Sequence, residues 1–391
     1  MSSEFERIAI QEFASKVETS RRTVKELRRN SLLHKFILDQ PTMLRHILIL
    51  GSTGSGKTNH AFRLIKMSSE EAAEQSSCIV IDVKREYRGL ASLLPGRVRV
   101  VSIGGEPKAH LNPLSPPKGV NAEHWDRAFA DVFTRTYGLS EPSRRILLDS
   151  LFGLRRAASE SPTLRELEQE VGRFKAGSSK EQASQRSLES RLHIINTGPI
   201  GESLNTEEVL DVEALHGITV FEIGEVDSLK DQRFLAELLL LYLWQHDKSQ
   251  PEPAEEKLRR LIVVEEAHRY LSEERPPEQR GERTLLELAI AEARRYGWGF
   301  LIIDQMPLLL SRYVWDNMGT VIVHRLANMD SYNVVKKVLV MNPLTQSEIV
   351  DDYLAPILLS LPEDIAVYRK YVGATLAAEL PVGVVGVPKV K

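Results

Sequence analysis

Six short apolar runs, separated by longer segments with helical periodicity, constrain the fold of this chain most strongly. Each run is five or six residues long and mostly apolar, as expected of strands that are buried on both faces. Strands that alternate with helical segments are typical of crossover units and a parallel sheet. We therefore expect an α/β fold with a mostly parallel sheet. The runs are His46–Leu50, Cys78–Asp82, Ile218–Ile223, Leu261–Glu265, Gly299–Asp304 and Thr320–His324.

Two segments depart from this alternation and indicate how the chain is organised. Residues 121–205 show helical periodicity with charged faces and no convincing strand, so we expect an α-helical insertion there. Residues 1–43 have the pattern of one or two helices, and we expect them to form a separate N-terminal arm. Residues 44–391 are then expected to be one domain that carries the insertion. Breaks between the helices of the insertion are expected at Glu141-Pro142, at Ser161-Pro162 and from Gly177.

Composition excludes several other classes of protein. Hydrophobic residues at 42% and charged residues at 27% are typical of a soluble globular chain. The single cysteine, Cys78, cannot form an internal disulfide, which favours a reducing, cytoplasmic setting. The run Leu238–Trp244 is too short to span a membrane and predicts a buried helix instead. Because the net charge is only -3, any surface that binds nucleic acid must be local.

A glycine-rich stretch directly follows the first run and opens a helical pattern. Gly51–Thr58 fits the phosphate-loop pattern of Gly, four residues and Gly-Lys-Ser/Thr. In this context backbone N–H groups and a helix N-terminus converge on polyphosphate. We expect Lys57 to neutralise the β and γ phosphates and Thr58 to bind Mg²⁺. A glycine-rich turn that fits by chance is the alternative, and the flanking strand and helix disfavour it. The residues expected to bind ATP are Gly51, Gly54, Ser55, Gly56, Lys57, Thr58 and Asn59.

Two adjacent carboxylates stand at the end of the run Leu261–Glu265. Because successive strand residues face opposite ways, Glu265 can serve the metal while Glu266 polarises water for attack on the γ phosphate. A solvated acidic strand end is the alternative. The long separation from Thr58, with a further strand between, favours the additional-strand, catalytic-glutamate division of phosphate-loop NTPases.

The chain resembles the HerA/FtsK family of hexameric DNA-translocating ATPases, and its HerA branch most. Several segments match beyond the general ATPase motifs, in the family's order, from about Leu44 to the C-terminus. Each match is weak alone, but the ordered set is specific. The resemblance implies a RecA-like ATPase domain that uses ATP and Mg²⁺. The segments are Asp82–Tyr87, Leu111–Leu114, Glu265–Tyr270, Ala293–Phe300, Asp304–Pro307 and His324–Leu326.

The same resemblance implies roles for two further positions. Arg294 matches the arginine finger that reaches the nucleotide of the neighbouring subunit, and Arg295 is the second candidate. Alternatively, these cations complement the dipole of a helix C-terminus before a Gly297 cap, and the two roles are compatible. Gln305 matches the polar sensor of the γ phosphate. Lys57, Glu266, Arg294 and Gln305 are therefore the expected catalytic set.

This sequence also departs from the family pattern. The family often has Asp at the position of Glu265 and a Ser-Gln-Arg-Pro-like sequence at Asp304–Pro307. Full-length HerA proteins carry an N-terminal β-barrel that supports docking of a nuclease. The 43 helical residues expected at the N-terminus are too few for such a barrel, so a nuclease or another effector is only a possible partner.

The resemblance implies a DNA-binding ring. A finger that acts in trans requires a head-to-tail interface, which closes into a ring when the rotation fits. The implied assembly is a homo-hexamer around double-stranded DNA, held by phosphate contacts. A solvated face is the alternative for each basic segment. The candidate DNA contacts are Lys84, Arg85, Tyr87 and Arg88, and the arm residues Arg21, Arg22, Lys25, Arg28 and Arg29.

Two functional hypotheses remain open at this point. The first is an ATP-driven ring motor that moves along double-stranded DNA. The second is an ATP-dependent switch or scaffold that assembles a complex with an effector and does not translocate. A transporter ATPase of the ABC type is disfavoured, because the sequence lacks a Leu-Ser-Gly-Gly-Gln-like signature.

Overall fold

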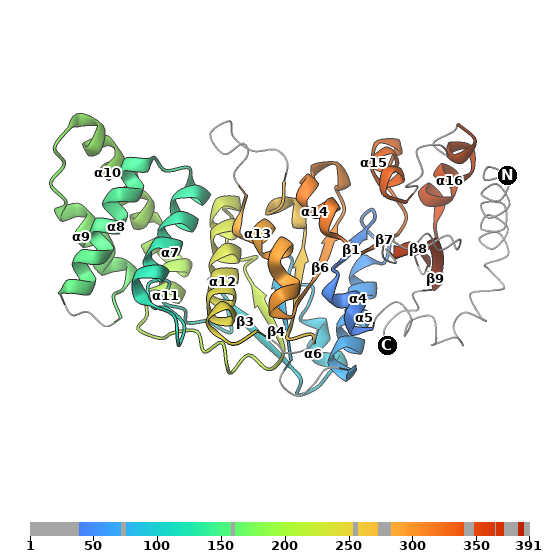
Figure 1. Cartoon of the computed structure of the whole chain (residues 1–391), viewed down its shortest axis with the longest axis horizontal. Coiled ribbons are helices and arrows are strands. Elements are labelled where there is room, and N and C mark those ends of the chain that lie inside the picture. The colour runs from blue at the N-terminus through green and yellow to red at the C-terminus, as the bar shows by residue number, and fades with distance from the viewer. Residues whose placement is uncertain are drawn as a thin grey trace. The chain divides into compact units, whose positions relative to one another are not determined.

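The computed structural model of the chain describes residues 39–71, 76–157, 161–252, 257–272, 283–339, 348–363, 365–370 and 382–386 (Figure 1). These residues form two compact units. Unit 1 contains the described residues up to Cys78, residues 257–272 and the described residues from Ile290 onward. Unit 2 contains the residues from Ile79 to 252 and those from 283 to Ala289. The expected domain 44–391 extends over both units. The basic stripe expected on the N-terminal arm lies outside the described residues.

Unit 1 is built on a mostly parallel sheet. Across the sheet its strands are β5 (Arg260–Glu265), β6 (Trp298–Asp304), β1 (Ile47–Leu50), β7 (Thr320–Val323), β8 (Ile365–Lys370) and β9 (Val382–Gly386). The first four strands are parallel, whereas β8 and β9 are antiparallel additions. Every residue of β5, β6, β1 and β7 is buried, which explains their apolar sequences. Because β6 lies between β1 and β5, it is the additional strand of the predicted fold division.

Helices of different lengths flank these strands in unit 1. Helix α5 (Lys57–Glu71) packs on β1 and β6, and α4 (Gln40–Leu44) packs on β6. Helix α13 (Leu285–Glu292) crosses the division between the two units. The other helices in the described part of unit 1 are η1 (Ala267–Arg269), η3 (Ala293–Tyr296), η4 (Pro307–Leu309), α14 (Arg312–Asn317), α15 (Met329–Leu339) and α16 (Glu348–Ser360).

Unit 2 combines a small sheet with a helical region. Its strands are β3 (Val98–Ser102), β4 (Gly217–Glu222) and β2 (Ser77–Asp82), with β4 in the centre and β3 parallel to it. Helix α7 packs against α8 and α12, and α10 packs against α8, α9 and α11 (Figure 1). The helices are α6 (Gly89–Leu93), α7 (Ala122–Tyr137), α8 (Glu141–Arg156), α9 (Leu164–Arg173), α10 (Ser179–Asn196), α11 (Gly198–Leu204) and α12 (Leu229–Ser249).

Side-chain caps start the helices of this region where the sequence predicted breaks. Asn121 caps α7, and Ser140 caps α8, with Pro142 in its first turn. Thr163 forms a capping box with Glu166 at the start of α9. Ser178 caps α10 by accepting a hydrogen bond from the N–H of Glu181. The short polar stretches in the sequence therefore act as helix starts.

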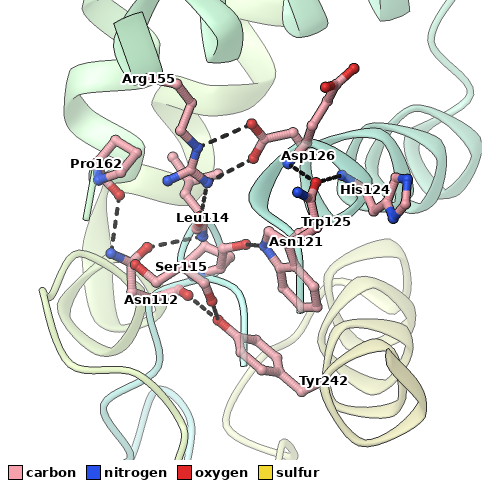
Figure 2. Close-up of polar contacts among 12 residues, drawn as sticks. Asn112, Leu114, Ser115, Asn121, His124, Trp125, Asp126, Arg155, Pro162 and Tyr242 are labelled. Atoms are coloured by element: carbon pink, nitrogen blue, oxygen red, sulfur yellow. Dashed lines mark hydrogen bonds and ion pairs between the residues drawn. The ribbon is translucent and has the colours of Figure 1, made fainter. Parts of the chain in front are cut away.

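A buried polar network holds the loop Asn112–Ser115 to three helices of unit 2 (Figure 2). The Tyr242 hydroxyl of α12 donates to carbonyl oxygens of Asn112 and Ser115. Trp125 of α7 donates to the Pro113 carbonyl at 3.1 Å. Arg155 of α8 binds Asp126 of α7 at 2.8 Å and the Leu114 carbonyl at 2.5 Å. The matched segment Leu111–Leu114 is therefore a packing element between helices.

All six strands expected from the sequence are present, and their bounds differ by one residue at most. The run Leu238–Trp244 lies in α12 and is buried, as predicted. Within the described part of the chain, no helix is both long and apolar enough to span a bilayer. The sequence analysis missed β3, β8 and β9. Arg99 is exposed and its neighbours are only partly buried, so β3 lacks the continuous apolar run that marks the central strands.

Candidate nucleotide-binding site

The glycine-rich stretch forms the connection between β1 and α5. Helix α5 begins at Lys57, so the first N–H groups of the helix face the loop. The loop is fixed from β7, because the Ser52 N–H donates to the Arg325 carbonyl at 2.7 Å and the His324 N–H donates to the Leu50 carbonyl at 2.8 Å. The fold therefore presents the loop as a ready anion site at the carboxyl ends of the strands.

Two glycines allow the close approaches in this loop. A Cβ at Gly51 would lie 2.6 Å from the Ser55 Oγ and 2.7 Å from the His324 Cβ. Gly56 has a φ of +96°, and a Cβ there would collide with the Glu363 carbonyl. Gly54 lies at the exposed tip, where a Cβ would have no neighbour within 4 Å. The loop needs glycine at positions 51 and 56 for packing, as well as for access to phosphate.

The polar side chains beside Gly56 contact the loop and the end of β5. Lys57 is 9% exposed, and its Nζ donates to the Ser52 carbonyl at 2.9 Å, so its charge lies over the loop. The Thr58 hydroxyl donates to the Glu265 Oε1 at 3.3 Å. Asn59 lies in the first turn of α5 and is partly exposed. The Ser55 side chain is buried, and its Oγ has no hydrogen-bond partner among the residues that the structure describes.

The two carboxylates after β5 take different environments, as their alternation predicts. Glu265 is the last residue of β5, and it faces Thr58. Glu266 adopts a left-handed backbone, with φ 51° and ψ 47°, before the short helix η1. Both side chains are buried. A solvated acidic strand end is therefore wrong for this pair. Left-handed backbone in a residue other than glycine is uncommon and tends to occur at functional sites.

Gln305 joins the phosphate loop to Glu266. It directly follows β6, and its Oε1 accepts a hydrogen bond of 2.7 Å from the Thr53 hydroxyl. Its Nε2 donates to the Glu266 Oε2 at 2.9 Å. The side chain therefore touches both the loop expected to hold the phosphates and the expected base. The sequence resemblance had indicated Gln305 without Thr53, which shows no distinguishing pattern in the sequence.

Two buried histidines, His60 and His324, support the phosphate loop. The His324 Nδ1 lies 2.9 Å from the Ser55 carbonyl, and its Nε2 lies 3.0 Å from the His60 Nδ1. A carbonyl only accepts, so the His324 Nδ1 carries the proton and His60 donates to the other nitrogen. Burial lowers the pKa of His324 to about 4, and the nearby Lys57 charge also lowers it. His324 is therefore neutral at pH 7 and fixes the Ser55 backbone.

Arg294 and Arg295 lie in η3, which follows α13 directly. Both side chains are exposed. Gly297 caps the turn in a left-handed conformation, and its N–H bonds the carbonyls of Ala293 and Arg294. Arg295 lies 5.9 Å from the ring centre of Tyr296. The helix-end geometry considered for these cations is therefore present, and it leaves both side chains on the surface of unit 1.

The segment after β2 differs from the expected channel lining. Tyr87 is fully buried, so it cannot contact DNA in this conformation. Arg88 forms a bidentate pair with Glu222, and Arg85 pairs with Glu225. Glu222 is itself buried at the end of β4. The charges of Arg85 and Arg88 are thus balanced by acids of unit 2, which a sequence pattern cannot show.

The residues of the site fit a magnesium nucleotide. Hydroxyl and carboxylate oxygens, as Thr58 and Glu265 supply, are the ligands that Mg²⁺ prefers, and phosphate and water commonly complete its shell. Lys57, the glycine loop and the start of α5 together favour an anion. The side chains expected to work in one protomer, Lys57, Thr58, Glu265, Glu266 and Gln305, therefore converge at one edge of the sheet.

A family model matches the part of the chain that contains the phosphate loop. The model of the HerA helicase central domain matches residues 33–241, which is more than half of the chain. The chain belongs to this family. The matched range of the HerA central domain includes the phosphate loop, whereas Glu265, Glu266, Arg294 and Gln305 lie beyond it.

Similar proteins extend this HerA relationship. The DNA double-strand break repair helicase HerA of Pyrococcus furiosus is 21% identical over 329 residues, which cover 75% of this chain and 58% of that protein. The chain thus spans less than two thirds of the length of this curated relative. VirB4 of Thermoanaerobacter pseudethanolicus has a TM-score of 0.61 at 17% identity, covering 84% of this chain and 87% of that chain. The conjugative coupling protein TrwBdeltaN70 has a TM-score of 0.63 at 12% identity, with coverages of 88% and 85%. These likenesses show the RecA-like phosphate-loop NTPase fold.

Proposed function

We propose that this chain hydrolyses ATP and uses the energy to move along double-stranded DNA as part of a ring. The observation that supports this most is the set of hydrogen bonds between the phosphate loop and the two strand ends beside it. Thr58 contacts Glu265 at the end of β5. Gln305, after β6, contacts both Thr53 and Glu266. A change in the phosphates at the loop would therefore reach the base directly.

In the proposed reaction a water molecule attacks the γ phosphorus, and the bond to the oxygen that bridges the β phosphate breaks. Glu266 accepts the proton of the attacking water, and Gln305 orients Glu266 and senses the γ phosphate. Lys57 and the loop N–H groups stabilise charge on the phosphates. Thr58 and Glu265 would hold Mg²⁺, which would supply positive charge to neutralise the negative charge that develops on the phosphates.

The exposed arginines of η3 are proposed to complete the site of a neighbouring protomer. Arg294 is the first candidate for the finger and Arg295 the second, because both side chains reach solvent next to β6. A finger that acts in trans makes hydrolysis depend on assembly, and repetition of such an interface gives a ring. A homo-hexamer is the proposed assembly.

Double-stranded DNA is the proposed track, and a nuclease or another effector is a possible partner. The HerA relative of Pyrococcus furiosus is described as a DNA double-strand break repair helicase, which supports DNA as the substrate class. Phosphate contacts that ignore base identity would let the ring move along any sequence. The paired Arg85 and Arg88 give no support for a contact after β2.

Hydrolysis by the full chain with and without linear duplex DNA tests the proposal. We expect the rate to rise with duplex DNA, and Glu266→Gln to bind ATP while losing about 10²- to 10⁴-fold in turnover. Arg294→Ala is expected to lose about 10³-fold or more. Arg312→Ala is the matched control, because Arg312 is exposed on the same unit and pairs with Asp316.

Mixing two inactive variants tests action in trans. In a mixed ring, an Arg294→Ala protomer keeps Glu266 and receives Arg294 from a Glu266→Gln neighbour. We therefore expect partial recovery of hydrolysis on mixing, and a ring mass by native mass spectrometry with a non-hydrolysable ATP analogue and duplex DNA. Full turnover by a monomer, or turnover indifferent to DNA, would contradict the proposal. Slow hydrolysis without displacement of a triplex strand would instead indicate the assembly switch.

A further inference from the structure

The carboxylate of Asp304, at the end of β6, contacts two different loops. Its Oδ1 accepts a hydrogen bond from the Met306 N–H at 2.5 Å. Its Oδ2 accepts one from the His268 N–H at 2.6 Å and lies 2.9 Å from the His268 Nδ1. The carboxylate is only 1% exposed. Because an ionised carboxylate only accepts, the His268 Nδ1 carries a proton that points at Asp304.

These contacts join the two loops that carry the proposed base and sensor. His268 belongs to η1, which directly follows Glu266, and Met306 directly follows Gln305. One carboxylate therefore sets the backbone on both sides of the hydrogen bond from the Gln305 Nε2 to the Glu266 Oε2. The His268 ring also approaches Glu266, with 3.7 Å from its Nδ1 to the Glu266 Oε2.

The backbone of Glu266 needs such support. Its φ of 51° lies in the left-handed region, which costs free energy for a residue that has a Cβ. The bonds from Asp304 to His268 fix the turn immediately after it. Without these hydrogen bonds, fewer contacts would hold η1 beside the end of β6.

We propose that Asp304 and His268 are positioning residues, which hold Glu266 and Gln305 in the geometry for hydrolysis without touching the nucleotide. The inference rests on the proposed function, because it assigns the pair to the hydrolytic step. It predicts that disruption lowers turnover and spares nucleotide binding, since neither residue contacts the phosphate loop in any hydrogen bond described above. Asp304 acts on both loops, whereas His268 acts on one.

Asp304→Asn is the most direct test. The amide keeps one acceptor oxygen, but its nitrogen would face a backbone donor, so one of the two loops loses its bond. We expect kcat to fall about 10²-fold, as for a misplacement near 1 Å, while the KM for ATP and the affinity for a fluorescent ATP analogue stay within about twofold. His268→Ala keeps its own backbone bond to Asp304, and we expect a smaller fall of about tenfold.

A double variant distinguishes positioning from general damage. If Asp304 acts through Glu266, Asp304→Asn adds little to the loss already caused by Glu266→Gln. Asp82→Asn is the matched control, because Asp82 also ends a strand and accepts backbone N–H groups, but in unit 2. We expect this control to leave the basal kcat unchanged. Losses that multiply in the double variant, or an equal loss of ATP affinity, would overturn the proposal.

An NMR measurement that does not depend on ATP turnover separates this inference from the proposed function. In protein labelled with ¹⁵N-histidine, the His268 Nδ1–H should give an exchange-protected signal at low field, which disappears in Asp304→Asn and His268→Ala. Absence of that signal in the parent chain would contradict the geometry itself. Presence of the signal in a chain that hydrolyses no ATP would reject the proposed function and, with it, the assigned role in hydrolysis.

Discussion

Asp82 and Asp304 each end a strand with a carboxylate that accepts backbone N–H groups. The donors to Asp82 come from one loop, whereas the donors to Asp304 come from two. The carboxylate of Asp82, in unit 2, accepts the N–H groups of Lys84, Arg85 and Tyr87, which all belong to the loop that follows its own strand. The carboxylate of Asp304, in unit 1, accepts from its own loop and from the loop after β5. The first arrangement closes a turn, and the second couples two strands. A buried carboxylate therefore serves stability or function according to where its donors come from.

The same contrast holds between larger regions. In unit 1 one set of buried polar side chains lies at the carboxyl ends of β5 and β6 and contacts the phosphate loop. In unit 2 another set ties the loop Asn112–Ser115 to helices (Figure 2). Substitutions in the first region should change turnover more than stability, and those in the second should do the reverse.

Among the substitutions that test this contrast between the two units, Lys57→Ala should have the largest effect. Lys57 is buried against the loop and supplies its positive charge, so we expect hydrolysis to fall by about 10³-fold with little change in the melting temperature. Lys108→Ala, which removes an exposed pair with Glu202 in unit 2, should leave both quantities close to the parent values. Steady-state hydrolysis and thermal melts measure the two effects. Similar losses in both variants would break the comparison.

Asp126→Ala should show the opposite behaviour. It leaves the Arg155 guanidinium in a mostly buried position without its carboxylate, so we expect the free energy of unfolding to fall by about 3 to 5 kcal/mol. Turnover per folded molecule should be unchanged, because the pair lies in unit 2. Urea denaturation and active-site titration give the two numbers. A turnover loss that exceeds the loss of folded protein would contradict the division of roles.

Unit 1 should lose stability at acid pH, because two of its buried histidines are neutral in the folded state. Burial lowers the pKa of His46 and of His324 from 6.5 to about 4. His46 must stay neutral, because its Nδ1 accepts from the Phe300 N–H while its Nε2 faces the Ile290 carbonyl. As the pH falls from 6.5 towards 4, these two histidines bind protons in the unfolded state but stay neutral in the folded state. Each histidine then costs about 3 kcal/mol of the free energy of unfolding.

Hydrogen exchange at pH 7 and pH 5 can locate this loss. Peptides from β1 and β6 should lose protection at pH 5, after correction for the intrinsic exchange rate. The control is His324→Asn, which removes one of the two groups and should reduce the pH dependence by about half. Protection that is independent of pH in β1 and β6 would show that these histidines are protonated without penalty.

Tyr242→Phe should give the smallest of these effects. It removes the hydroxyl that donates to the carbonyls of Asn112 and Ser115, and it keeps the ring that packs on Trp125. We expect a loss of about 1 to 2 kcal/mol in the free energy of unfolding and no change in turnover. Urea denaturation measures it. A turnover change would mean that the Asn112–Ser115 loop influences the nucleotide site.

The sequence predicted the parts of the molecule that leave a local pattern. Continuous apolar runs identified the central strands, and glycine spacing identified the phosphate loop. Strand β3 was missed because Arg99 interrupts its apolar run and the strand is only partly buried. Tyr87 and Arg88 were candidate DNA contacts beside the alternative of a solvated loop, and nothing in the sequence shows that Tyr87 is buried or that Arg88 pairs with Glu222. The link from Asp304 to His268 depends on strand order, which no short segment encodes.

Strand β6 would link two parts of the site mechanically in the ring proposed above. Arg294 and Arg295 lie just before its first residue, and Gln305 follows its last, with a span of seven residues or about 20 Å between. Hydrogen bonds to β1 on one side and β5 on the other keep the strand from sliding alone. If Arg294 contacts the nucleotide of a neighbouring protomer, as proposed, β6 would connect that contact rigidly to Gln305, and a displacement at one end of the strand would reach the other end.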